Sequence, residues 1–150
     1  MFAPPKIATL RTRHVCAILL AFASLGARAQ PFDWTLLNGQ WAESVRNAYG
    51  CRPDNVHHRF EVSADHKHLV FALDRQWKIG TGQEVLRYSA AIVAESPTML
   101  TIRYDPELTG IPASMRDWEL LFIGPGTYRW RATFWREGQY NDVVGVKCAP

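Results

Sequence analysis

Four histidines in one short segment are the densest group of side chains that could do chemistry: His57, His58, His66 and His68. Neutral imidazole is a common ligand of zinc and copper. In an extended chain, however, the adjacent His57 and His58 point to opposite faces. His58 and His68 would lie about 16 Å apart along a hairpin, at about 3.3 Å per residue. We therefore predict no metal and no other cofactor.

His58 has the most informative position of the four, because it is a polar side chain on the otherwise apolar face of a predicted strand, near its end. Such a side chain can donate a hydrogen bond to a ligand at the mouth of a barrel. Tyr88, Tyr104 and Tyr128 fall on the same predicted face and can add hydroxyl groups. The alternative is a histidine that bonds to a backbone carbonyl and only completes the core.

Paired carboxylates are a second candidate for chemistry, since Asp117 and Glu119 lie two positions apart and share one face of a predicted strand. That face is the solvated one, and Arg129 and Arg131 lie opposite, so a charged outer surface is expected. The chain also lacks the Gly-x-Ser-x-Gly, His-Glu-x-x-His and phosphate-loop motifs. We therefore predict that the protein is not an enzyme.

The elements that position these residues are strands, because apolar and polar residues alternate with a period of two from about residue 56 onward. Three hairpins are predicted, joining 57–63 to 68–74, joining 86–94 to 99–104, and turning at 124–126. Each register is chosen to gather apolar side chains on one face. The registers pair Ser63 with His68; Tyr88 with Tyr104, Ala90 with Ile102 and Ile92 with Leu100; and Phe122 with Tyr128, Leu120 with Trp130 and Trp118 with Ala132.

Two further strands complete the predicted sheet, one containing residues 39–41 and the last spanning 143–148. Eight antiparallel strands in chain order can close into an up-and-down barrel, which leaves no unpaired edge. We therefore predict an all-β, eight-stranded antiparallel up-and-down barrel. Trp41, Val45 and Tyr49 are spaced by four and are followed by Gly50, which predicts one short helix over 42–49.

The predicted interior is rich in aromatic rings, and an eight-stranded barrel is only just wide enough for its own side chains. The inward rings are Trp41, Phe60, Phe71, Tyr88, Tyr104, Trp118, Phe122, Tyr128, Trp130 and Phe134. If side chains fill the interior, we expect the functional residues to lie in the loops. Trp77 lies in the predicted loop 74–84 and is interpreted as a lid or interface residue if exposed, and as a plug of the barrel if buried.

Gly39-Gln40-Trp41 at the start of a β-meander resembles the Gly-x-Trp of the first strand of lipocalin-like (calycin) proteins. The resemblance implies a barrel closed at one end by Gly39 and Trp41, with a basic residue of the final strands packed on the tryptophan, here Arg136 or Lys147. The family's Thr-Asp-Tyr motif and its helix after the last strand are missing. The resemblance covers about 32–148 as architecture and favours a minimal bacterial lipocalin-like domain.

Residues 1–29 have the pattern of a secretory signal peptide: basic residues, a short apolar run over 15–23, and Ala27-Arg28-Ala29 before the predicted cleavage site after Ala29. The domain is then 30–150, in the periplasm or secreted, without a permanent membrane anchor. The whole chain has a net charge of +3, but the segment removed carries four basic and no acidic residues, which leaves 13 Lys and Arg against 14 Asp and Glu. This balance argues against nucleic-acid binding.

Two cysteines remain in the predicted mature chain, Cys51 and Cys148. A cysteine pair in an exported protein persists as a disulfide. This bridge would tie the last strand to the N-terminal segment and suits closure between the first and last strands.

Two functions are therefore expected from the sequence. The first is binding of a small apolar or amphipathic ligand, through His58, Tyr88, Tyr104, Tyr128 and Trp77, by a monomeric barrel. The alternative is a protein-binding module, such as a periplasmic inhibitor of a protease or of lysozyme, which small secreted bacterial barrels with one disulfide resemble in architecture.

Overall fold

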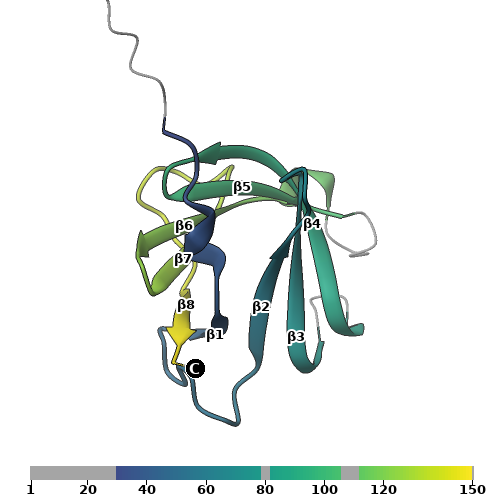
Figure 1. Cartoon of the computed structure of the whole chain (residues 1–150). Coiled ribbons are helices and arrows are strands. Elements are labelled where there is room, and N and C mark those ends of the chain that lie inside the picture. Colours follow the sequence, from purple (N-terminus) through teal and green to yellow (C-terminus); the bar gives the residue numbers. More distant parts are fainter. Residues whose placement is uncertain (1–29, 79–81, 106–111, 150) are drawn as a thin grey trace, which may run out of the picture.

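The computed structural model describes residues 30–78, 82–105 and 112–149 and shows a closed antiparallel barrel (Figure 1). The strands, in chain order around the barrel, are β1 (Gln40–Val45), β2 (His57–Val62), β3 (His68–Lys78), β4 (Glu84–Ser96), β5 (Met99–Tyr104), β6 (Asp117–Gly124), β7 (Thr127–Ala132) and β8 (Val143–Cys148). Two short 3₁₀ helices, η1 (Trp34–Leu37) and η2 (Ala113–Met115), are also present. The prediction of an all-β, eight-stranded up-and-down barrel is confirmed.

The barrel closes through β1, which pairs with β8 along its whole length, from Gln40 opposite Cys148 to Val45 opposite Val143. On its other side β1 pairs with β2 at only two positions. Because the β1–β8 ladder is the longer of the two, β8 is the main support of β1. The first and last strands are therefore adjacent, as the sequence predicted.

The predicted helix over 42–49 is wrong, because residues 40–45 form β1 and the segment after it turns sharply. Arg46 and Asn47 have φ angles of 52° and 57°, which a right-handed helix does not allow. Trp41 and Val45 lie on a strand in which alternate residues share a face, so their spacing of four fits a strand as well as a helix. The backbone pairing with β8 makes this segment a strand rather than a helix.

The registers of the first and third hairpins are confirmed, and that of the second is wrong. Ala90 pairs with Tyr104 and Ile92 with Ile102, a shift of two positions from the prediction, and the register changes again between Ile92 and Ala94. A shift of two keeps the same side chains on the inner face. Hydrophobic alternation could not distinguish these registers, and the irregularity near Val93 was not visible in the pattern.

One end of the barrel, at which β2, β4, β6 and β8 finish, is covered by η1 and is called the closed end. Phe32 and Leu37 are buried there, and the Trp34 ring stacks on His66 with centroids 4.1 Å apart. The Gly-x-Trp segment leads into β1: Gly39 has a φ of 99°, which favours glycine, and Trp41 is fully buried.

The basic residue that packs on Trp41 is Lys147, whose Nζ lies 5.7 Å from the ring centroid. Lys147 is the β8 residue directly opposite Trp41, so the pairing of the two strands brings the ammonium to the ring. A Cβ on Gly39 would meet the Lys147 side chain at 2.8 Å, so the glycine also leaves room for it. Of the two residues predicted for this contact, the structure selects Lys147.

The opposite end, at which β1, β3, β5 and β7 finish, is called the open end, and two predicted positions there need correction. Phe134 is 53% exposed, because it follows the last residue of β7 and lies beyond the inner face of the sheet. Trp77 belongs to β3 rather than to a loop, because β3 extends to Lys78. It is 51% exposed, as expected for a lid or interface residue.

The predicted disulfide between Cys51 and Cys148 is present, with the two Cα atoms 5.4 Å apart and 97 positions between them in sequence. Such a bond is compatible with a location outside the cytoplasm. The predicted signal peptide, residues 1–29, lies outside the described residues. Within the described part of the chain, no helix has the length and apolar character needed to cross a membrane.

Replacing both cysteines by serine should lower the free energy of unfolding by about 2–5 kcal/mol, because the bond restricts the unfolded chain over a long loop. Urea unfolding of the exported, oxidised protein measures the difference. The reduced wild-type protein is the control and should unfold at the midpoint of the double variant. A loss below about 1 kcal/mol would show that the closed sheet alone holds the chain ends together.

Candidate functional site

A carboxylate inside the barrel is the centre of the candidate site. Glu43 has the same orientation on β1 as the buried Trp41, so its side chain enters the barrel. It is paired with Gly145 on β8, and Gly145 is paired with Tyr128 on β7. The three residues form one row across three strands.

Gly145, the middle residue of this row, allows the side chains of Glu43 and Tyr128 to reach each other. A Cβ at Gly145 would collide with ring atoms of Tyr128, so the Tyr128 ring lies directly over the glycine. Glycine weakens a strand, and it is retained where another group must approach the backbone closely. Here the absence of a side chain lets Tyr128 cross β8 and reach Glu43.

Two aromatic donors converge on one oxygen of Glu43. The Tyr128 hydroxyl donates to Oε1 at 2.5 Å, and Nε1 of Trp130 donates to the same atom at 2.6 Å. These are charge-assisted hydrogen bonds, which are shorter and stronger than bonds between neutral groups. They fix the carboxylate against the wall formed by β7.

His58 extends the network on the other side of Tyr128, with Nε2 2.9 Å from the hydroxyl oxygen. The single hydroxyl proton of Tyr128 is directed to Glu43, so His58 donates from Nε2 and carries its proton there. Burial lowers the pKa of His58, and this effect exceeds the opposing effect of Glu43. Burial first, and then Glu43, raise the pKa of Tyr128. Both groups are therefore neutral near pH 7.

A cavity of about 60 Å³ adjoins this network near the open end. It is lined by Glu43, Val56, His58, Leu73, Trp77 and Tyr88. Since a water molecule occupies about 30 Å³, the cavity has the size of about two waters or one small polar head group. Its walls combine one carboxylate, one imidazole and one phenol with aromatic and aliphatic surface.

The structure brings most of the predicted site residues together. His58, Tyr88 and Trp77 line the cavity, and Tyr128 lies directly behind it in contact with His58. Tyr104 does not line the cavity, but its ring centroid lies 6.2 Å from that of Tyr88. Burial raises the pKa of both Tyr88 and Tyr104, with a further increase caused by other charged or phenolic groups, so both hydroxyls stay protonated.

Sequence reasoning missed Glu43, because it fell in the segment interpreted as a helix. The signal that could have found it is the alternation of Trp41, Glu43 and Val45, which places an acidic residue on the inner face of a strand. Trp130 was predicted to be interior, and its role as a hydrogen-bond donor to Glu43 was also missed. Both roles depend on contacts between residues more than 80 positions apart.

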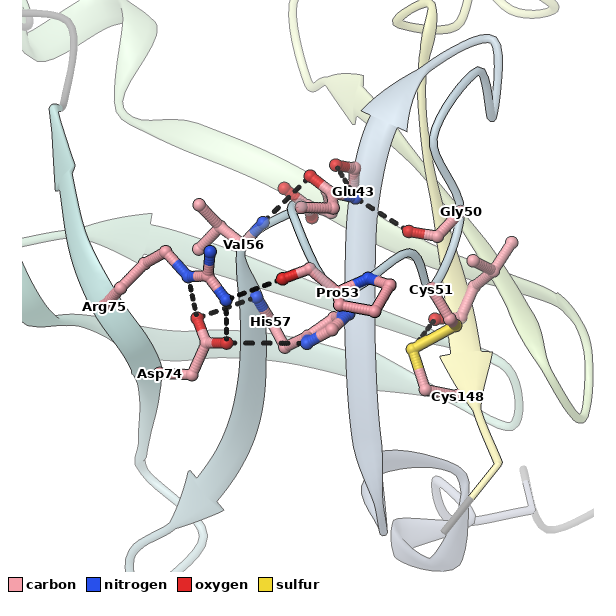
Figure 2. A network of polar contacts seen from close by, with 11 residues as sticks. Glu43, Gly50, Cys51, Pro53, Val56, His57, Asp74, Arg75 and Cys148 are labelled. Carbon is pink, nitrogen blue, oxygen red and sulfur yellow. Dashed lines mark hydrogen bonds and ion pairs between the residues drawn. A yellow bond between two sulfur atoms is a disulfide. The ribbon is translucent and has the colours of Figure 1, made fainter.

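The segment 46–56 folds back along the outside of β1 and holds it in place (Figure 2). Nδ2 of Asn55 donates to the carbonyl oxygens of Glu43 and Gly50, at 3.2 and 2.7 Å. The backbone amides of Tyr49 and Gly50 donate to Oγ of Ser44. The backbone that carries Glu43 is therefore bound on its outer side as well as through β8.

The same segment is tied to β3, as Figure 2 shows around Asp74. Arg75 donates to the carbonyl of Pro53 at 3.0 Å and to the Asp74 carboxylate. The backbone amide of His57 also donates to Asp74, and Nδ1 of the His57 ring lies 3.4 Å from that carboxylate. Together with the disulfide between Cys51 and Cys148, these contacts hold the segment 46–56 against β3 and β8.

Outside the barrel, a hollow of about 860 Å³ is lined mainly by outward-facing residues of β2, β3 and β4, with Gln40 and Cys148 at its border. Its charges are largely paired, as in the contact of Arg87 with Glu61. Nε2 of His57 is buried and has no hydrogen-bond partner among the described residues. The hollow therefore combines paired charges with one unpartnered imidazole nitrogen, whereas the polar groups that converge on one another lie in the interior.

The other predicted candidates are dispersed. His66 stacks on Trp34 at the closed end, far along the strands from His58. The described residues contain no group of three side chains placed to hold a metal ion. Glu119 is ion-paired with Arg131, as expected, whereas Asp117 is paired with Arg103 of β5 and not with Arg129. Arg129 lies opposite Leu121.

No protein family model matches the chain. No curated protein matches it either.

Replacing Gly145 by Ala should displace the Tyr128 ring and lower the free energy of unfolding by about 1–3 kcal/mol, because the core has no room for the added methyl group. Urea unfolding measures the loss. Gly124→Ala is the matched control, since a Cβ there meets nothing within 4 Å, and it should change stability much less. Equal losses in both variants would contradict the close packing of Tyr128 on Gly145.

Lowering the pH from 7 to 5.5 should reduce the free energy of unfolding by up to about 1.3 kcal/mol through His58. The unfolded chain binds a proton near the ordinary pKa of 6.5, whereas burial keeps folded His58 neutral to lower pH, so stability falls as the pH falls. The lowered pKa values of Asp65, Asp74 and Asp117 act nearer their ordinary value of 3.8, below this range.

The variant His58→Gln is the control for this pH dependence, because its amide can donate to Tyr128 and does not titrate. Its unfolding free energy, measured in urea at both pH values, should change less between them than that of the wild type. An identical change in the two proteins would show that folded His58 takes up a proton as readily as the unfolded chain does.

Proposed function

We propose that this protein is a non-enzymatic, lipocalin-like binding protein, exported through the signal peptide of residues 1–29, that holds a small amphipathic ligand at the open end of its barrel. The cavity beside Glu43 and His58 carries the proposal. It combines converging polar groups with apolar surface, which is typical of sites for small molecules.

The size of the cavity decides how a ligand would lie. The aromatic rings of the barrel fill most of the interior, with Phe71 stacked on Tyr88 at 4.5 Å and Trp41 fully buried beside Tyr128. A volume of about 60 Å³ accepts only a head group. The apolar part of the ligand would then lie toward the open end, along Trp77, which borders the cavity and is half exposed.

Replacing Trp77 by Ala should abolish retention of a small molecule while leaving the fold intact, because a half-exposed ring at a strand end contributes little to the core. Native mass spectrometry of protein purified after export, before and after denaturation, detects a retained ligand. The wild type should carry an additional mass that Trp77→Ala lacks.

Phe134→Ala is the matched control for this experiment. Phe134 is 53% exposed, close to the value for Trp77, but it does not line the cavity. This variant should keep the ligand. A wild-type protein without any additional mass, or equal loss in the two variants, would argue against binding at the cavity.

Protein binding is the second candidate function, and a partly exposed apolar cluster at the open end favours it. The cluster consists of Met115 and Phe134, which are exposed, and Trp118 and Trp135, which are half-buried. The Trp118 and Trp135 rings lie 5.6 Å apart, and Phe134 and Trp135 lie 6.4 Å apart. Exposed tryptophan and phenylalanine are enriched in the centres of protein interfaces.

The two variants also separate the two functions. In a pull-down of purified periplasmic proteins, a partner of the apolar cluster would be lost with Phe134→Ala and retained with Trp77→Ala. Loss of the ligand from Trp77→Ala and its retention by Phe134→Ala would instead support binding of a small molecule at the cavity. Loss of neither a ligand nor a partner in these variants would contradict both candidates.

A further inference from the structure

We propose that the head group bound in the cavity is an organic cation, a protonated primary amine, held by Glu43. This inference rests on the proposed function and specifies the class of its ligand. It is carried by the charge, the hydrogen bonds and the walls of the site.

The Glu43 carboxylate lacks a cationic partner in the part of the chain that the structure describes. Among the described residues, no lysine or arginine forms an ion pair with it, although six other ion pairs are present. The segments 79–81 and 106–111 contain no lysine or arginine in their sequence. His58 is kept neutral by burial. Among the described residues, the part-buried Glu43 carboxylate therefore has no cation to offset its charge, and charges held away from water are normally paired.

The hydrogen bonds of Glu43 leave one oxygen available. Both Tyr128 and Trp130 donate to Oε1, and Oε2 receives no hydrogen bond from the described residues. Glu43 itself lines the cavity, at the edge of the network. A donor on a ligand would therefore complete the coordination of the carboxylate without displacing either aromatic partner.

The walls of the cavity also suit a cation. Trp77 and Tyr88 line it with aromatic surface, and Tyr128 and Trp130 lie behind Glu43. Aromatic faces attract ammonium groups, and tryptophan does so most strongly. A protonated amine head with its first methylene group fits a volume of about 60 Å³, and its alkyl part would follow Leu73 and Trp77 outward.

Other ligand chemistries fit less well. An anionic head group would face the Glu43 carboxylate with no positive charge to offset the repulsion. A metal ion would find one carboxylate and an imidazole whose Nε2 already bonds to Tyr128. A neutral hydroxyl could accept or donate a hydrogen bond there, but it would leave the charge of Glu43 uncompensated.

The test uses three probes that share one alkyl chain: decylamine, which is protonated at pH 7, decanol and decanoate. Binding to the exported, disulfide-bonded protein is followed by tryptophan fluorescence and by calorimetry, below the micellar concentration of each probe. Decylamine should bind at least tenfold more tightly than decanol, and decanoate should bind most weakly.

Glu43→Gln should bind decylamine at least tenfold more weakly and decanol about as well as the wild type, because the amide oxygen can still accept from Tyr128 and Trp130. Glu84→Gln is the matched control, since Glu84 is exposed at the start of β4 on the same end and its replacement changes the net charge equally. It should leave all three affinities unchanged. Unchanged preference for decylamine in Glu43→Gln would overturn the assignment to Glu43.

The remaining outcomes separate the two proposals. If the wild type binds the three probes equally, amphiphile binding stands and the preference for a cation is wrong. If it binds none of them, the proposed function fails and the cation proposal fails with it. The comparison of probes on the wild type does not depend on the folding of the Glu43 variant.

Discussion

The contact of Tyr128 with Glu43 across Gly145 ties three neighbouring strands together, and it links the closing β1–β8 ladder to the polar interior of the barrel. β1 is joined to β2 by only two residue pairs, so the ladder with β8 must support it. The Tyr128 ring spans that ladder from β7 and bonds to Glu43 on β1. A side chain at position 145 would fill the space through which the ring passes.

A barrel of eight strands has a narrow interior, and here large aromatic rings occupy it. Phe71 and Tyr88 stack, and Trp41, Phe60 and Tyr128 pack edge to face or at a tilt. Rings of this size leave little free volume, so the remaining cavity is small and lies where the packing changes from apolar to polar. The closed end is covered by η1, and Trp77 borders the cavity at the open end.

Much of this fold could be predicted from the sequence, because its strands follow hydrophobic alternation and its first and third turns have tight, polar or glycine-rich sequences. Pairing of Ser63 with His68 and of Phe122 with Tyr128 followed directly from that pattern. The second hairpin did not, since a shift of two preserves the inner face. Phe134 was placed inside because alternation was extended one residue pair beyond the end of β7.

The site was harder to predict than the fold, because its central residue, Glu43, lies on a strand too short to be recognised from its sequence pattern. His58 and the three tyrosines were found because polar groups stood out on an apolar face, but Glu43 was found only in the structure, on a strand whose short pattern also fits a helix. A carboxylate inside a barrel is costly unless its charge is compensated. Glutamine could accept the same hydrogen bonds from Tyr128 and Trp130 without that cost. These two hydrogen bonds therefore need an acceptor at position 43 but not a charge, and a conflict of this kind between local cost and the residue present is characteristic of functional positions.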